Sequence, residues 1–186
     1  MKKLFILLLP VIMFACGKGV EQYRAGIEAL AADWDATTSA VTEFSSTIAG
    51  DLSNFTQLSG SLQLSEDVQK KLKPEQVTEW QNAQAAFAQA LQPFAPLRTQ
   101  VGEFTKTWGD KTAEVQALKD GLAAGKLEGD VTGQIDSLTT FVAQAKESLT
   151  GWQTSHAAAK SGAQAAGDAL KAVYDKLNAE AAAKKK

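Results

Sequence analysis

Apolar residues recur along most of the chain at alternating steps of three and four residues. These steps average 3.5 residues, the repeat that keeps one side of a helix against its neighbours in coiled-coil packing. Three such stripes, over residues 20–62, 80–122 and 131–177, predict three long helices that each bury one face. The third is the most regular and comprises Val131, Ile135, Leu138, Val142, Ala145, Leu149, Trp152, His156, Ala159, Ala163, Ala166, Leu170, Val173 and Leu177.

The segments between the stripes carry residues that end and begin helices. Gly60 closes the first stripe, and Gly121, Gly125 and Gly129 close the second, as glycine commonly does at helix C-termini. A short helix is expected over residues 66–73 with Ser65 as its N-cap. Pro74 then suits the first turn of the next helix, where its missing N–H has no partner to lose.

Two prolines, Pro93 and Pro96, fall inside the second stripe, where interior prolines kink or break a helix. The apolar phase nevertheless continues, because Phe94 and Leu97 keep a correct step of three. We therefore expect one long helix with a kink. The alternative is a real break at Pro93 to Pro96, which would give four helices.

The three stripes have similar lengths, and short connections join them. The third stripe corresponds to about 70 Å of helix. Helices of similar length with short connections pack as antiparallel neighbours. The expected fold class is all-α, a long up-down-up antiparallel three-helix bundle with heptad packing.

Bulky and small residues should face one another across this bundle. When the helices are aligned from Val20, Leu122 and Val131, aromatic residues fall at the levels of alanines. Native packing density requires such pairing of large with small side chains. The predicted pairing sets Phe44, Phe55, Phe87 and Phe94 against Ala159, Ala163 and Ala166, and Trp34 and Trp108 against Ala145.

The chain begins with a basic start and an uncharged apolar run. Lys2 and Lys3 precede residues 4–14, which would span only about 16 Å as a helix, roughly half the thickness of a bilayer core. Such a segment is typical of the apolar region of a signal peptide and not of a spanning helix. We expect residues 1–15 to be removed on export.

Met13-Phe14-Ala15-Cys16 ends this run and resembles a lipobox, the motif of bacterial lipoproteins. The resemblance implies a diacylglyceryl group on Cys16 and a second acyl group on its freed amine. Two or three acyl chains hold a protein stably on a membrane. Met13 replaces the usual leucine, and Gly17 replaces the aspartate that retains many enteric lipoproteins at the inner membrane, so an outer-membrane location facing the periplasm is favoured. The alternative is an ordinary signal peptide.

We divide the chain into the signal peptide (1–15), a lipidated linker (16–19), the helical bundle (20–180) and an Ala/Lys tail (181–186). After an odd number of helices, the tail would lie at the far end from Cys16. Its last residues, Lys184, Lys185 and Lys186, resemble in outline the lysine end of Braun-type murein lipoproteins, which is joined to peptidoglycan. The resemblance implies a candidate wall contact.

Charge and composition exclude some classes of function. The 19 basic and 21 acidic residues are dispersed along the chain, whereas nucleic-acid binding needs a concentrated basic face. Cys16 is the single cysteine, which excludes an intramolecular disulfide. We expect no nucleic-acid partner and a fold that depends on packing.

Few residues suggest chemistry. His156, the single histidine, lies on the third stripe, and Asp51 interrupts the first at a similar level. They are candidates for a buried polar pair that fixes helix register, with a ligand or pH-sensing role as the alternative. We find no metal-ligand spacing, haem attachment or nucleophile motif. We expect no catalytic residue, no metal and no cofactor apart from the lipid on Cys16, and we expect the four tryptophans in the core.

The sequence thus favours a non-enzymatic, lipid-anchored protein of the cell envelope. It would act as a helical spacer, scaffold or partner-binding rod, and its partner would be an envelope protein or cell-wall polymer. The alternative is a periplasmic binding or chaperone-like module that uses a cleft near Pro93 to Pro96.

Overall fold

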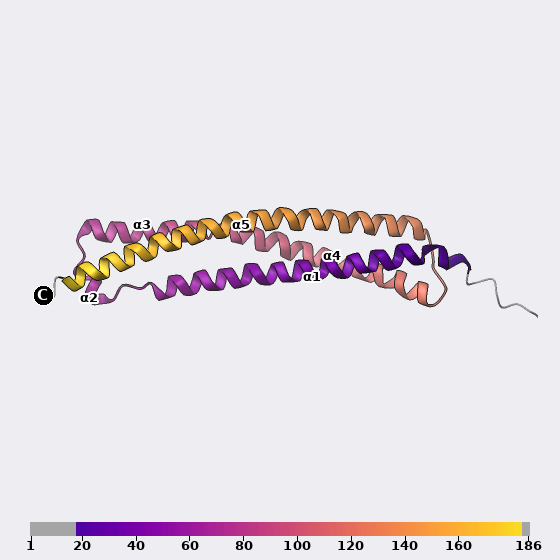
Figure 1. Cartoon of the computed structure of the whole chain (residues 1–186), viewed down its shortest axis with the longest axis horizontal. Helices are drawn as coiled ribbons and strands as arrows, with labels where there is room; N and C mark the ends of the chain where they lie inside the picture. Colours follow the sequence, from indigo (N-terminus) through magenta and orange to yellow (C-terminus); the bar gives the residue numbers. More distant parts are fainter. Residues whose placement is uncertain (1–17, 184–186) are drawn as a thin grey trace, which may run out of the picture.

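The computed structural model describes residues 18–183, and helices form most of this part of the chain. The all-α prediction is confirmed for these residues, none of which lies in a strand. The molecule is elongated, and the helices run along its length (Figure 1). They are α1 (Lys18–Ser61), α2 (Glu66–Gln69), α3 (Pro74–Ala90), α4 (Phe94–Ala123) and α5 (Val131–Ala183).

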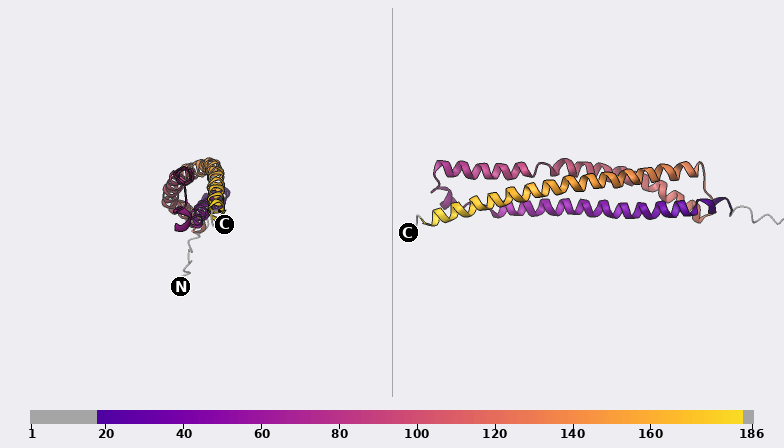
Figure 2. Two further views of the ribbon diagram at one scale, coloured as in Figure 1. Left: turned by 90° about the vertical axis from the view of Figure 1, so that its left-hand side faces the viewer. Right: turned by 45° about the horizontal axis from the view of Figure 1, so that its top comes forward.

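Helices α3 and α4 follow one another along the molecule, in the direction opposite to α1 and α5 (Figure 1). The right-hand view of Figure 2 shows the same order. Helix α1 packs on both α4 and α5. Helix α3 packs mainly on α5, whereas α4 packs mainly on α1 and more sparsely on α5. The returning arm, α3 with α4, therefore changes its main neighbour halfway along the molecule.

The predicted start signals form caps. The side chain of Ser65 accepts a hydrogen bond from the Val68 N–H at the start of α2, and Pro74 opens α3. Asp130 caps α5, because its carboxylate accepts a hydrogen bond of 3.0 Å from the Gly133 N–H. Each contact satisfies an N–H group that a helix start leaves without an intrahelical partner.

Glycines shape the connection from α4 to α5. Gly125 and Gly129 have φ values of 68° and 75°, a left-handed conformation that glycine adopts without steric cost. At Gly121, a Cβ atom would lie 2.8 Å from the Lys126 carbonyl oxygen. The loop can fold back this closely because Gly121 has no side chain.

The expectation of one continuous kinked helix across the second stripe is wrong. Helix α3 ends at Ala90 and α4 begins at Phe94, which agrees with the alternative of a break. The break covers residues 91–93, and Pro96 lies inside the first turn of α4. The two helices remain joined by a turn of right-handed backbone, with φ −85° at Leu91 and −63° at Pro93.

The missing N–H groups of the two prolines explain this turn. In a continuous α-helix they would donate to the carbonyl oxygens four residues back, at Gln89 and Gln92. The N–H groups of Gln92 and Ala95 donate to those oxygens instead, at 3.1 Å and 3.2 Å. Bonds between residues three apart wind the chain by about 120° per residue instead of about 100°. The apolar face of α4 is therefore rotated relative to that of α3.

The stripes form the core as predicted. Every position of the third stripe is buried or half-buried. The buried residues form two clusters, a smaller one at the end where α1 begins and a larger one that runs through the level of the break to the other end. The predicted partners share clusters: the four phenylalanines lie with Ala159, Ala163 and Ala166 in one, and Trp34 and Trp108 lie with Ala145 in the other.

The helices extend slightly beyond the bundle boundaries predicted from the sequence. Helix α1 begins at Lys18, within the segment 16–19 assigned to a linker. Helix α5 continues to Ala183, and Ala181 is buried. The apolar packing therefore reaches into the segment assigned to the tail.

At Gly167, neighbouring helices approach α5 more closely than the sequence suggested. A Cβ atom there would lie 2.9 Å from a methyl group of Leu58 and 3.2 Å from the Phe87 ring. We expect Gly167→Ala to destabilise the protein, although alanine is favoured over glycine in a helix by about 0.5–1 kcal/mol. Urea unfolding would measure the change.

Gly102→Ala is the matched control, because a Cβ atom at Gly102 would meet nothing within 4 Å. This variant should gain about 0.5–1 kcal/mol of unfolding free energy. An equal gain at Gly167 would show that the close approach of Phe87 is unimportant for packing.

Candidate functional site

Of the three sites predicted from the sequence, the described residues contain one, the pair Asp51 and His156, and the structure brings its two residues together. Asp51 on α1 and His156 on α5 lie in contact near the middle of the rod. Cys16 and the lysines at 184–186 lie outside the described residues. The polar cluster around His156 is therefore the first candidate site in this part of the chain.

Three charged or titratable side chains form this cluster. His156 Nε2 lies 3.0 Å from Asp51 Oδ2, and Lys160 Nζ lies 2.9 Å from Asp51 Oδ1. The His156 and Asp51 side chains are 8% and 13% exposed, whereas that of Lys160 is 39% exposed. The approach of Asp51 to the ring nitrogen falls within ion-pair distance but outside hydrogen-bond geometry. The two facing atoms are thus buried without a hydrogen-bond partner.

Aromatic rings enclose His156. The ring planes of Phe44 and Phe94 are nearly perpendicular to the plane of the imidazole ring, and the centroid distances are 5.5 Å and 5.7 Å. Phe94 is the first residue of α4, so the cluster lies at the level of the break between α3 and α4. No charged residue occurs between Glu79 and Arg98, and these helices therefore add no charge to the cluster.

The cluster consists of one carboxylate, one imidazole and one ammonium group. Within residues 18–183, no group of three or more histidine, cysteine, aspartate or glutamate side chains could hold a metal ion. The contacts of the His156 ring include Phe44, Phe94 and the Asp51 carboxylate. The cluster instead links α1 to α5 at one defined height, which is how buried polar residues fix helix register.

A second polar contact, which the sequence analysis missed, joins α1 to α4. The rings of Trp34 and Trp108 stack with centroids 3.7 Å apart and planes 16° apart. Each indole N–H donates to a threonine on the opposite helix: Trp34 to Thr112 at 3.3 Å and Trp108 to Thr38 at 2.8 Å. Each threonine hydroxyl in turn donates to the tryptophan carbonyl four residues before it on its own helix.

The repeated spacing Trp-x-x-x-Thr is the signal that could have revealed this contact. It occurs at Trp34–Thr38 and at Trp108–Thr112. On two antiparallel helices the same spacing produces a locally symmetric pair, because each threonine lies one turn beyond its tryptophan. The pair satisfies both buried indole N–H groups.

Further aromatic residues extend from this stack into the space between α4 and α5. Phe141 lies 5.4 Å from Trp108 and 6.2 Å from Phe104, and Trp152 meets Phe104 at 5.3 Å. Phe104, Phe141 and Trp152 are only half-buried. They fill the side on which α4 and α5 pack sparsely.

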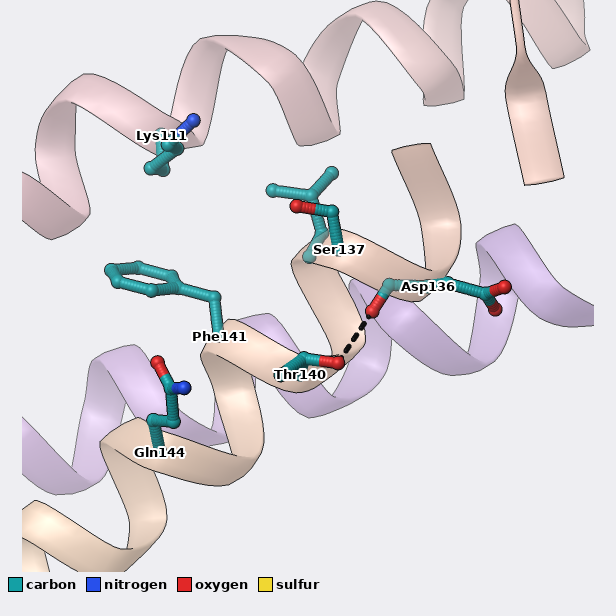
Figure 3. A pocket seen from close by; sticks show the side chains of 7 residues that line it. Lys111, Asp136, Ser137, Thr140, Phe141 and Gln144 are labelled. Carbon is teal, nitrogen blue, oxygen red and sulfur yellow. Dashed lines mark hydrogen bonds between the residues drawn. The ribbon is translucent and has the colours of Figure 1, made fainter. Parts of the chain in front are cut away.

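A hollow of about 400 Å³ opens beside Phe141. The Phe141 ring projects from α5 into the space facing Lys111 on α4, with polar side chains of α5 beside it (Figure 3). Thr140 donates to the Asp136 carbonyl oxygen at 2.8 Å. The hollow combines one aromatic ring with several hydrogen-bonding groups, and its lining residues are Lys111, Asp136, Ser137, Leu138, Thr140, Phe141 and Gln144.

The break itself is packed. Phe87, Phe94 and Leu97 around it are all buried. The hollows found in the described residues lie elsewhere, beside Phe141, at the α4–α5 loop and around α2. The cleft expected near Pro93 to Pro96 is not among them.

Three lysines of α5 form ion pairs with other helices, one in each third of the rod. The outer two pairs lie on the surface and contribute little stability individually, because water screens exposed charges, whereas Asp51 in the middle pair is largely buried. Together they mark the register of α5 against its neighbours. The pairs are Lys146–Asp33, Lys160–Asp51 and Lys176–Glu79, each with an N–O distance of 2.9 Å.

The pKa shifts in the described residues belong to such exposed pairs. The hydrogen bond from Lys176 to Glu79 raises the pKa of Lys176. Near the start of α1, the hydrogen bond from Arg24 lowers the pKa of Glu21 and the same contact raises the pKa of Arg24. These shifts arise from ion pairs whose charged groups are exposed to solvent.

No family model, curated protein or solved structure that we compared with the chain matches it. Within the described residues, no helix combines the length and the apolar character needed to cross a membrane. The class of protein that the fold and candidate site define is an elongated all-α rod with a buried polar cluster at its middle.

We expect His156→Leu to lower the free energy of unfolding by about 1–3 kcal/mol, because it leaves the Asp51 carboxylate buried against an apolar side chain. The double variant Asp51→Leu/His156→Leu should recover wild-type stability or exceed it, since buried ionic pairs are often less stabilising than apolar replacements. Urea unfolding followed by circular dichroism would measure both.

Lys160→Gln serves as the control for loss of the exposed partner alone and should change stability little. If the double variant were as unstable as the two single changes combined, the pair would be a net source of stability and not a register device.

Proposed function

We propose that this protein is a non-enzymatic lipoprotein of the bacterial cell envelope, held to the membrane by lipid on Cys16. Its helices would act as an up-down-up three-helix rod, in which α3 and α4 together form the returning arm. The rod would serve as a spacer, scaffold or partner-binding surface. No cofactor apart from the lipid is proposed.

One structural observation carries the role of spacer. Helix α1 begins at one end of the rod and α5 ends at the other (Figure 1). Helix α5 has 53 residues, which corresponds to about 80 Å at 1.5 Å per residue. A lipid on Cys16, two residues before α1, would therefore leave the end of α5 far from the membrane.

The surface and core fit a structural role. Many threonine side chains outside the seam form local contacts on their own helix, such as the bonds from Thr42, Thr140 and Thr150 to carbonyls four residues back. The buried side chains are almost all apolar. For the alternative, a periplasmic binding or chaperone-like module, the hollow beside Phe141 is a candidate surface, because an aromatic ring lies there beside polar side chains of α5.

We expect Cys16→Ala to abolish incorporation of labelled palmitate and to release the protein from the membrane fraction, because the thiol is the proposed attachment point. Met13→Leu, which restores the usual lipobox residue, is the matched control and should remain lipidated. Fractionation of cells that express each variant would test both. A Cys16→Ala protein that stayed membrane-bound after removal of residues 1–15 would refute the anchor.

A wall contact through Lys184, Lys185 and Lys186 is the second candidate, supported by the position of the end of α5. We expect deletion of these lysines to reduce the amount of protein that sediments with isolated cell wall. Replacement of all three by arginine keeps the charge but removes the amine needed for a covalent link. Muramidase digestion that released no muropeptide-linked protein, together with unchanged sedimentation of the deletion variant, would exclude the contact.

A further inference from the structure

The helical hydrogen bonding of the returning arm is interrupted at the middle of the rod. In the turn over residues 91–93, Pro93 supplies no N–H, and the N–H groups of Gln92 and Phe94 donate to carbonyl oxygens only three residues back. Proline is also among the few established causes of sharp bends in helices. Helices α3 and α4 pack mainly on different neighbours, so they do not form one rigid layer across this point.

The contact between α1 and α5 is unusual at the same level. Phe94 fixes that level, since its ring lies 5.7 Å from His156 and 5.9 Å from Phe55. Here α1 contributes Asp51, whose Oδ2 faces His156 Nε2 without a hydrogen bond. A polar contact of this kind stabilises less than the interlocked apolar side chains found above and below it.

Glycines lower the helix stability of both α1 and α5 beside the polar cluster. Gly50 precedes Asp51, and Gly162 lies two residues after Lys160. A Cβ atom at either glycine would meet nothing within 4 Å, so close packing does not account for them. Glycine inside a helix costs about 0.5–1 kcal/mol relative to alanine.

The packing on either side of this level is tighter. Towards the start of α1, Trp34 and Trp108 stack and exchange hydrogen bonds with threonines. Towards the end of α5, the Phe87 ring packs directly against Gly167, in space that a Cβ atom at this position would crowd. Both halves therefore resist deformation more than the segment between them.

We infer that the rod has a compliant joint at its middle, where the 91–93 turn, the Asp51–His156–Lys160 cluster, Gly50 and Gly162 lie at one level. The parts of the rod on either side bend against each other at this joint, through which the larger apolar cluster is continuous. A spacer built this way changes its end-to-end span without unfolding. The inference depends on the packing of residues 18–183 and holds whether or not Cys16 carries lipid.

Distances between spin labels on full-length protein in detergent test this inference. Labels would be attached to cysteines introduced at Asn82 on α3 and Ala113 on α4, both exposed, in chains that carry Cys16→Ser. A control pair at Gln100 and Ala117 lies within α4 alone. We expect the distance distribution across the joint to be distinctly broader than that of the control pair.

Two variants should narrow the distribution across the joint. Gly50→Ala/Gly162→Ala stiffens both long helices, and Asp51→Leu/His156→Leu replaces the polar contact by apolar packing. Gly102→Ala/Gly109→Ala is the matched control, because both glycines are equally open but lie on α4 away from the cluster. This control should leave the width unchanged.

Circular dichroism and urea unfolding would establish that each variant is folded before its distances are interpreted. A wild-type distribution no wider across the joint than within α4 would overturn the inference. Equal narrowing of the distance distribution by the two pairs of glycine substitutions would also overturn it. Flexibility would then be a general property of the glycine-containing helices and would not be specific to the joint.

Discussion

The apolar seam with its repeat of 3.5 residues is the interaction on which the rest of this structure depends. Each arm offers one narrow apolar face, and no arm could bury that face alone. The fold therefore exists only when three arms lie together along their whole length. Even small residues such as Ala163 are then essential, because they make room for rings such as Phe94 on the facing helices.

The seam tolerates the loss of helix geometry in the returning arm. Phe87 and Phe94, which flank the interruption, are both buried, so apolar contact is continuous while the backbone bonds change. The tighter winding of the turn rotates the apolar face at the same point where the main neighbour of the returning arm changes from α5 to α1. The same event leaves the side between α4 and α5 less filled, where half-buried aromatic rings and the hollow beside Phe141 occur. One local backbone constraint thus shapes both halves of the surface.

Much of the fold, but less of the candidate site, could be predicted from the sequence. The stripes, the caps at Ser65 and Pro74 and the pairing of phenylalanines with alanines follow from local patterns that packing later uses unchanged. The contact between Asp51 and His156 was also foreseen, because both residues interrupt stripes at similar heights. The Trp34–Trp108 contact was missed, since its hydrogen bonds depend on which two helices face each other and not on either helix alone.

The sequence by itself determined where the long helices lie and which faces they bury, because a periodic stripe acts through local geometry. It also carries the lipobox-like segment at Cys16, which no contact in the described residues can replace or explain. Only the tertiary structure decided that the prolines end a helix, that α3 and α4 choose different neighbours, and that Lys160 joins Asp51. Those outcomes depend on the sum of many contacts between distant segments. The conformation or partner that a single proline or carboxylate adopts is decided only when its neighbours in space are in place.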